Sequence, residues 1–320
     1  MKKQQLLALL LALLMLLALA ACGKKPPEEE SSSQPEAPAA PVEYPVELRD
    51  TIILEEPENV VSLSPALTEL MQYMGLEGML EGVSDYCDSG VSTRCGTPQQ
   101  INYDSIREAR PDLVISTASL AEEDMVALQQ LNVDVLILPR AGSLEELEEL
   151  YVDLGRALLG EETGRACGEE LWAEFEEQLD ELAARGEDFA DERGSRPTAI
   201  FLRMLDYTMA TGDTFEHQLL EELGFKNLAA DYGDWTFPKE NAAQLTPDLI
   251  ISDDAITIPV LEQNAVYKGT QAVIKDQVVT VDAAAFERQT PRLLEELGRV
   301  ADFLFDGVVE ARSAQTGDQI

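Results

Sequence analysis

Six short runs of apolar residues, set between segments with helical patterning, constrain this chain more than any other feature. Each run is a nearly continuous stretch of Val, Ile and Leu, which is typical of parallel strands that are covered on both faces. Three runs lie in the first half, at 59–64, 112–116 and 133–139, and three in the second, at 198–204, 248–252 and 277–282. The alternation of strand and helix predicts an α/β fold with parallel sheets.

The segments between the strands carry helix boundary signals. In "SPALTELMQYMG", Ser64 is the expected N-cap and Gly75 the expected terminator. In "DTFEHQLLEELG", Asp213 is the expected N-cap and Gly224 the terminator. Both segments therefore fit short helices of the kind that cover a parallel sheet.

A long helical segment at 161–188 separates the two groups of strands. The apolar residues that follow helical spacing in it are Leu171, Trp172, Phe175, Leu179 and Leu182. This segment is longer than most helices of globular proteins. We therefore expect two Rossmann-like lobes with central parallel sheets, at 44–160 and 196–310, joined by one long rigid helix.

A repeated heptapeptide links the two expected lobes. "RPDLVIS" at 110–116 returns as "TPDLIIS" at 246–252, and an acid stands seven residues before each proline, Asp104 in the first copy and Glu240 in the second. In both copies a short helix must end near the proline, because the residue before proline disfavours the helical conformation. Either acid alone is explained by the helix dipole, but together they place one acid at the same point of each lobe.

The N-terminal segment carries the signals of export. Residues 1–21 have a basic start, an apolar run and a small-residue end, as in a secretory signal peptide. "LAAC" at 19–22 resembles a bacterial lipobox and makes Cys22 the expected lipidated residue; an uncleaved anchor or simple secretion is the alternative. Residues 22–43 are rich in Pro, Ser and Glu, a composition that predicts a disordered linker.

Charge and motif content exclude several classes of function. The formal net charge of −38 argues against a nucleic-acid partner, which needs a basic surface. The sequence has no G-x-S-x-G, P-loop or G-x-G-x-x-G motif, and its single His cannot build a histidine-rich metal site. We therefore expect neither an enzyme nor a resident metal or cofactor.

Two cysteines lie close together in a loop-like stretch, "DYCDSGVSTRCG". In an extracytoplasmic protein, Cys87 and Cys95 are candidates for a disulfide. Two free thiols are the alternative.

Five segments resemble, in the same order, those of the cobalamin and ferric-siderophore substrate-binding proteins of ABC importers. They are "NVVSLSPALTEL" (59–70), "GVSDYCD" (82–88), "NYDSIREARPDLVIS" (102–116), "TGDTFEHQLLEELGFKNLA" (211–229) and "FERQTPRLLEEL" (286–297). Together with the lipobox, the resemblance implies a monomeric, lipid-anchored protein at the extracytoplasmic face of the membrane. It also implies a ligand held between the lobes and delivery to a permease that works with a cytoplasmic ATPase. Because one long helix resists hinge bending, we expect little lobe movement on binding.

The resemblance assigns residues to both tasks. The family's two docking acids, which pair with permease arginines, fall on Asp104 and Glu240, although Asp is one methylene shorter than the more usual Glu. The residues expected to contact the ligand are Ser64, Tyr86, Trp235, Phe286, Glu287 and Arg288. Other residues expected near the ligand, at the carboxyl ends of strands, are Ser62, Ser116, Thr117, Leu205, Asp206, Tyr207, Asp253, Asp254 and the rest of 283–288.

The same resemblance narrows the ligand to a metal chelate. The aromatic side chains of Tyr86 and Trp235 suit a flat corrinoid, whereas Pro98 and Ala118 stand where the cobalamin branch has aromatic residues. A corrinoid is therefore favoured, with a ferric siderophore or haem as the alternative. A surface lipoprotein that scavenges or senses its ligand without transport is a further reading.

Overall fold

The computed structural model describes residues 43–306. The expected signal peptide at 1–21, Cys22 and nearly all of the linker at 22–43 lie outside the described residues, as does the stretch after 306.

The N-terminal lobe is built on a four-stranded parallel sheet in the order β4-β3-β7-β8. Its strands are β3 (Val60–Ser62), β4 (Leu80–Val83), β7 (Leu113–Ser116) and β8 (Asp134–Ile137). Two small antiparallel pairs accompany it, β1 (Val46–Leu48) with β2 (Thr51–Ile53) and β5 (Gly96–Thr97) with β6 (Gln100–Ile101). The lobe's helical elements are α2 (Pro65–Tyr73), η1 (Glu77–Met79), α3 (Tyr103–Ala109), α4 (Glu122–Gln130) and α5 (Leu144–Leu159).

The C-terminal lobe repeats this plan with a parallel sheet in the order β10-β9-β11-β12. Its strands are β9 (Thr198–Leu202), β10 (Lys226–Asn227), β11 (Leu249–Asp253) and β12 (Val278–Val281). The helical elements are α7 (Phe215–Glu222), η2 (Lys239–Gln244), α8 (Ile258–Leu261), α9 (Gln271–Ile274), α10 (Ala283–Arg288), α11 (Arg292–Ala301) and η3 (Asp302–Asp306). The expected α/β fold with parallel sheets is confirmed, and all six expected strands are present.

The repeated heptapeptide forms the same inner strand in each lobe, β7 and β11. Its aspartate ties the start of that strand to the neighbouring one: Asp112 accepts hydrogen bonds from the N–H groups of Glu58 and Asn59, both at 2.9 Å, and Asp248 accepts from the N–H of Thr198 at 2.8 Å.

The serine of the repeat fastens the other end of the strand. Ser116 Oγ donates to the carbonyl of Ala118 at 2.8 Å, and Ser252 Oγ donates to that of Ile256 at 2.9 Å. The aspartate and the serine therefore have the same roles in both copies, because each lobe holds the two ends of its inner strand with the same hydrogen bonds.

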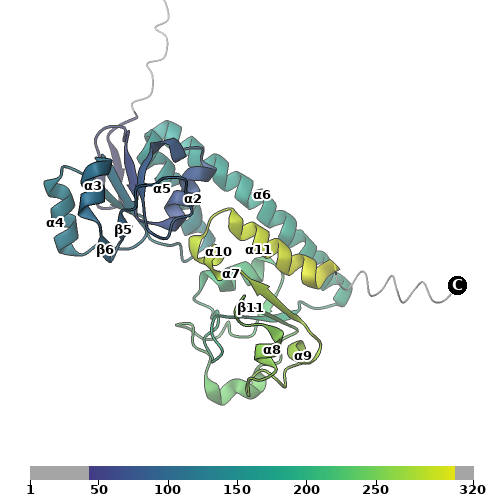
Figure 1. Ribbon diagram of the computed structural model, residues 1–320. Coiled ribbons are helices and arrows are strands. Elements are labelled where there is room, and N and C mark those ends of the chain that lie inside the picture. The colour runs from purple at the N-terminus through teal and green to yellow at the C-terminus, as the bar shows by residue number, and fades with distance from the viewer. Residues whose placement is uncertain (1–42, 307–320) are drawn as a thin grey trace, which may run out of the picture. The chain divides into compact units, whose positions relative to one another are not determined.

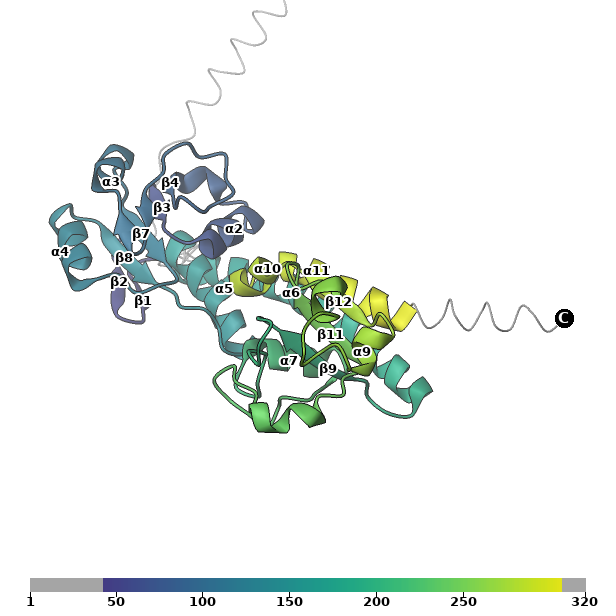
Figure 2. The same cartoon turned by 60° about the horizontal axis from the view of Figure 1, so that its bottom comes forward.

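The long helix α6 (Glu161–Arg193) runs along both lobes in Figures 1 and 2, and α11 packs against it in the C-terminal lobe. It extends beyond the expected end at 188 and stops where Gly194 takes a left-handed φ of 82°. Its 33 residues span about 50 Å at the usual helical rise. One long helix between two α/β lobes confirms the expected architecture.

A close crossing with α5 fixes the direction of α6. A Cβ atom added to Gly164 would lie 2.1 Å from the carbonyl oxygen of Gly155, so only glycine allows the two backbones to approach this closely. Next to the crossing, Trp172 stacks on Phe175 and both rings meet the edge of Tyr151. The buried cluster around these rings continues into both lobes.

Helix starts follow the expected chemistry at α2 but not at α7. Ser64 caps α2 and accepts from the N–H of Leu67 at 3.4 Å. At α7 the cap is Thr214, not Asp213, and Thr214 Oγ1 accepts from the N–H of His217 at 3.1 Å. Asp213 instead braces a neighbouring loop by accepting from Thr211 Oγ1 at 2.6 Å and from the N–H of Asp234 at 2.9 Å.

Candidate ligand-binding site

Of the residues expected to contact a ligand in the N-terminal lobe, Tyr86 is accessible and Ser64 is not. Tyr86 follows β4 and is 74% exposed. Ser64 is 1% exposed, and its hydroxyl caps α2 and lies 3.0 Å from that of Thr117. In this structure the Ser64 hydroxyl therefore shapes the end of β3, and its contact with a ligand stays a prediction.

In the C-terminal lobe, Trp235 and Glu287 are connected through Arg203, the first residue after β9. The Arg203 guanidinium lies 5.5 Å from the centre of the Trp235 ring, a cation–π distance, and also pairs with the Glu287 carboxylate. The backbone holds Trp235 in place, because its N–H donates to Thr211 Oγ1 at 3.0 Å while its φ is 59°. The half-buried Trp235 ring is therefore braced from two sides.

The neighbours of Glu287 serve the framework of the protein. Phe286 is 2% exposed, and its ring centre lies 4.8 Å from that of Phe201. The Phe286 ring thus packs in the core of the C-terminal lobe, and its contact with a ligand stays a prediction. Arg288 donates to Glu69 of α2 at 3.0 Å, so its guanidinium is committed to an ion pair between the two lobes.

Arg288 belongs to a set of residues that fastens one lobe to the other, which we name the inter-lobe clasp: Glu69, Ala141, Arg288, Gln289 and Thr290. Glu69 also accepts from Thr290 Oγ1 at 2.7 Å. Gln289 makes two reciprocal bonds with Ala141, accepting from its N–H and donating to its carbonyl, both at 2.8 Å. Gln289 and Thr290 are 1% and 0% exposed, so the inter-lobe clasp has a buried hydrogen-bonded part beside the partly accessible pair of Arg288 and Glu69.

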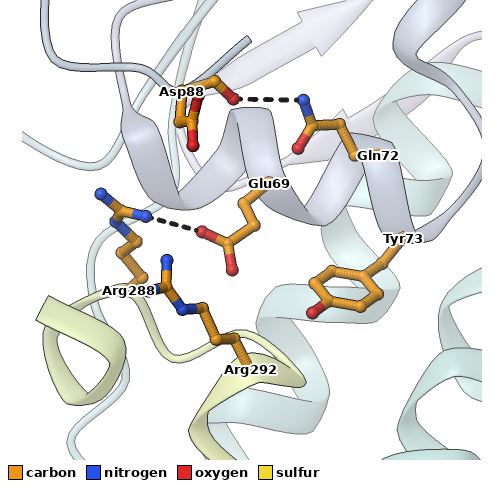
Figure 3. A pocket seen from close by; sticks show the side chains of 6 residues that line it. All are labelled: Glu69, Gln72, Tyr73, Asp88, Arg288 and Arg292. Atoms are coloured by element: carbon orange, nitrogen blue, oxygen red, sulfur yellow. Dashed lines mark hydrogen bonds and ion pairs between the residues drawn. The ribbon is translucent and has the colours of Figure 1, made fainter. Parts of the chain in front are cut away.

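A pocket of about 310 Å³ lies beside the inter-lobe clasp. Figure 3 shows Arg288 and Arg292 on one side of it, Glu69, Gln72 and Tyr73 of α2 on the other, and Asp88 above. Both guanidinium groups are already paired, Arg288 with Glu69 and Arg292 with Asp282, each at 3.0 Å. The pocket thus belongs to the joint between the lobes.

A second group of charges lies where the two lobes contact each other. We name Arg140, Arg203, Glu216 and Glu287 the charged floor. Arg140 follows β8, is 44% exposed in its side chain, and donates to the carbonyl of Phe286 at 3.2 Å. Glu216, in the first turn of α7, is 2% exposed.

The buried carboxylate of the charged floor is incompletely paired. Glu216 Oε1 lies 3.6 Å from Arg140 Nη2 and has no hydrogen-bond partner in the described part of the chain. Burial raises the pKa of Glu216, an effect that Arg140 and Arg203 reduce and Glu287 increases. Sequence reasoning missed both Arg140 and Glu216. The position of Arg140 just after a strand was the one available signal.

Exposed apolar side chains follow Arg203. Met204 is 60% exposed and Leu205 is 40% exposed. They continue the loop after β9, which lies at the carboxyl end of the sheet, where ligands bind in open α/β folds. We name Tyr86, Met204, Leu205 and Trp235 the apolar rim. Met204 was missed in the sequence, although a large apolar residue directly after a strand was a usable sign.

The two expected docking acids lie in the first turns of equivalent helices, Asp104 in α3 and Glu240 in η2. Both are exposed, and the Asp104 side chain is 96% accessible. Asp104 pairs with Arg107 at 2.8 Å. Asp104 and Tyr86 both line an open pocket of about 590 Å³.

The expected disulfide is not formed, and both cysteines are buried free thiols. Cys87 Sγ lies 3.2 Å from Thr68 Oγ1, whereas Cys95 packs in a different cluster. Arg94 closes the loop in place of a disulfide, because its guanidinium donates to the carbonyls of Cys87 at 2.9 Å and Ser89 at 3.3 Å. Burial raises the pKa of both thiols, that of Cys95 to about 11.

Between 43 and 306, no group of three or more His, Cys, Asp or Glu side chains is arranged to hold a metal ion. Within the same range, no helix combines the length and the apolar character that crossing a membrane requires.

Curated proteins with similar sequences extend over most of the chain. An uncharacterized ABC transporter substrate-binding lipoprotein of Bacillus subtilis, YvrC, is 25% identical over 266 residues, which is 80% of this chain and 83% of that protein. A cobalamin-binding protein of Halobacterium salinarum is 25% identical over 279 residues, covering 82% of this chain and 73% of the relative.

Solved structures share the fold at lower identity. A possible iron-binding, periplasmic solute-binding protein of Staphylococcus epidermidis superposes with a TM-score of 0.66 at 22% identity, over 78% of this chain and 99% of the other. A periplasmic heme-binding protein of Pseudomonas aeruginosa gives a TM-score of 0.64 at 21% identity, over 78% and 93% of the two chains. Residues 60–285, which span both lobes and α6, match the family described as periplasmic binding protein, and the chain belongs to that family.

Proposed function

We propose that this protein is the substrate-binding component of an ABC importer and captures a metal chelate between its two lobes. The observation that carries the proposal is the family match over residues 60–285, which includes both sheets and the helix between them. Proteins of this family bind solutes for transport, and the two relatives above are named for ABC transport and for cobalamin.

The apolar rim supports a large, partly apolar ligand. Tyr86, Met204 and Leu205 follow the carboxyl ends of β4 and β9, and Trp235 lies in a loop that pairs with the one after β9; all four are exposed or half-buried rather than packed in the core. Aromatic and thioether side chains offer large contact areas to flat ring systems. We propose a corrinoid as the ligand, with a ferric siderophore or haem as the alternative, in keeping with the names of the relative in H. salinarum and the structure from P. aeruginosa.

The remaining parts of the proposal concern the cell envelope. Lipidation of Cys22 would hold the protein at the extracytoplasmic face of the membrane through acyl chains. Asp104 and Glu240 would pair with arginines of the permease, because exposed carboxylates suit charge-assisted bonds with guanidinium groups. The short Asp104 would first have to release Arg107, with which it pairs at 2.8 Å.

Titration of purified residues 23–320 tests the ligand assignment. Cobalamin, cobinamide, haem and a panel of ferric siderophores would be followed by calorimetry, with Tyr86→Ala and Trp235→Ala as the matched variants. Saturable one-to-one binding of a corrinoid that weakens in both variants supports the proposal. Binding of a ferric chelate or haem without a corrinoid would show that the alternative ligand is the correct one. If no chelate binds, the proposal is overturned.

The transport role needs a separate test. In cells that depend on this protein for uptake of the identified ligand, we expect the double variant Asp104→Ala/Glu240→Ala to lose uptake while the purified variant still binds. The double variant Glu148→Ala/Glu262→Ala, which removes one exposed acid from each lobe, is the control. Unchanged uptake with the Asp104/Glu240 variant would favour a scavenging or sensing lipoprotein.

A further inference from the structure

Arg140 stands out within the charged floor because its guanidinium is accessible and only loosely paired. A guanidinium carries five N–H donors. In the described part of the chain, only Nη2 of Arg140 has partners, the carbonyl of Phe286 at 3.2 Å and the Glu216 carboxylate at 3.6 Å. Charge-assisted bonds between nitrogen and carboxylate are normally about 2.7–2.9 Å long, so the pair with Glu216 is loose.

Other arginines near Arg140 also bond through a single nitrogen, but each of them lies within hydrogen-bond distance of its carboxylate. Arg203 pairs with Glu287 and covers Trp235. Arg288 is joined to Glu69 at 3.0 Å, with 22% and 14% of the two side chains exposed. Arg140 is more accessible, at 44%, and its counter-ion Glu216 is 2% exposed and therefore out of reach of solvent and ligand. A free, accessible donor is thus backed by a buried carboxylate.

The position of Arg140 places this donor at the ligand side of the molecule. It follows the carboxyl end of β8, and Arg203 follows that of β9 in the other lobe. The charges of Arg140, Arg203 and Glu287 all act on the pKa of Glu216. The protein as a whole carries a net charge of −38. The accessible guanidinium of Arg140 is therefore a positive group on a strongly negative molecule.

We propose that Arg140 selects metal chelates that carry a carboxylate or phosphate group, by binding that group with its free N–H donors. Glu216 acts as a positioning residue that holds the guanidinium from behind. The incoming oxyanion completes the hydrogen bonding that the 3.6 Å pair leaves open. This inference rests on the proposed function and adds the charge of the ligand to it.

Matched ligands that differ only in charge test the proposal. Haem and haem dimethyl ester share one ring and differ in their carboxylates, and cobinamide phosphate differs from cobinamide by its phosphate. Whichever class the protein binds, we expect the anionic member to bind on the order of tenfold tighter or more, the size of one charge-assisted hydrogen bond. In Arg140→Gln this preference should disappear, while affinity for the neutral member stays within twofold.

The variant Arg196→Gln is the control, because Arg196 has a similar side-chain exposure of 50% and pairs with Glu221 at 3.1 Å in the C-terminal lobe. It should keep the preference. Glu216→Gln adds a second readout: a positioning role predicts that the anion preference weakens with little change for the neutral ligand. Thermal melting checks that each variant is folded.

The outcomes separate this proposal from the function on which it rests. Equal affinity of the wild type for both members of a pair, or an unchanged preference in Arg140→Gln, would overturn the role of Arg140 and leave the binding function intact. Failure of the wild type to bind either pair or any ferric siderophore would overturn the function itself. If ferric chelates alone bind, ferric tricarboxylate and neutral ferric trihydroxamate complexes replace the pair, and the same loss of preference is expected.

Discussion

The inter-lobe clasp and the charged floor lie at the same junction between the lobes but differ in how completely their polar groups are satisfied. In the clasp, Gln289 is 1% exposed and forms two 2.8 Å bonds with Ala141. In the floor, Glu216 is equally buried, yet its Oε1 has no hydrogen-bond partner among the described residues and lies 3.6 Å from the cation of Arg140. Buried polar groups are nearly always paired in proteins, so the difference is informative.

We propose that the inter-lobe clasp belongs to the structural framework and that the charged floor belongs to the ligand-binding site. A complete set of buried bonds fixes one arrangement of the lobes, together with the close crossing of α5 and α6 at Gly155 and Gly164. An incomplete set leaves donors available to something that is bound. We therefore expect substitutions in the inter-lobe clasp to lower stability, and substitutions in the charged floor and the apolar rim to change ligand binding.

The largest effect on stability is expected from Gln289→Ala. The change leaves the N–H and the carbonyl of Ala141 without their side-chain partner, and buried unpaired groups cost about 1–3 kcal/mol each. We expect the free energy of unfolding, measured in urea, to fall by about 3 kcal/mol. The control Gln263→Ala, at an exposed helix end where Nε2 donates to Pro259 at 2.9 Å, should change it little.

A smaller loss is expected from Glu69→Gln. The amide removes the charge that Arg288 faces at 3.0 Å but keeps an acceptor for Thr290 Oγ1. Because both members of the pair are partly accessible, at 14% and 22%, we expect a loss of about 1–2 kcal/mol. The exposed Glu148 of α5 supplies the matched control, and a loss of equal size in Glu148→Gln would contradict the importance of the clasp.

Glu216→Gln should raise the free energy of unfolding relative to wild type at neutral pH, whereas the two substitutions in the inter-lobe clasp lower it. Burial raises the pKa of this carboxyl above 4.5, so the folded state holds its proton more tightly than the unfolded state. Stability is then lost as pH rises through the window between the unfolded and folded pKa values. The amide cannot ionise, so we expect the stability of Glu216→Gln relative to wild type to increase from pH 4 to pH 7. A constant difference across this range in urea titrations would show that Glu216 does not titrate abnormally.

The smallest effect on stability is expected from Tyr86→Ala. At 74% exposure the side chain contributes little to the core, and the free energy of unfolding should change by less than about 0.5 kcal/mol. Ligand affinity should nevertheless fall, because an exposed aromatic ring loses its contact area with a bound ring system. Urea unfolding and calorimetry on the same preparation separate the two effects. Loss of stability without loss of affinity would remove Tyr86 from the apolar rim.

The sequence predicted the framework well where the signal was local. Continuous apolar runs identified the strands, Ser64 was correctly placed as the cap of α2, and the helical spacing around Trp172 identified α6. Each of these features depends on residues within a few positions of one another. The cap of α7 was missed by one residue, because Asp213 and Thr214 both have suitable side chains and the loop contacts of Asp213 decided between them.

The site was less predictable because its contacts join distant residues. Gln289 and Ala141, or Arg140 and Glu216, carry no sign of one another in the sequence. The resemblance to known families placed Phe286 beside the ligand, but its packing against Phe201 is decided by how α10 lies on the sheet. The spacing of Cys87 and Cys95 favoured a disulfide because nothing local indicated that Arg94 closes that loop.

The central claim is that a ligand binds between the two lobes at the apolar rim and the charged floor. Hydrogen–deuterium exchange of the ligand-free and ligand-bound protein tests it most directly. We predict slower exchange in the loops 84–88, 203–208 and 233–237 of both lobes, with α6 and the inter-lobe clasp unchanged. Protection confined to one lobe, or centred on the pocket between α2 and α11 in Figure 3, would contradict the claim.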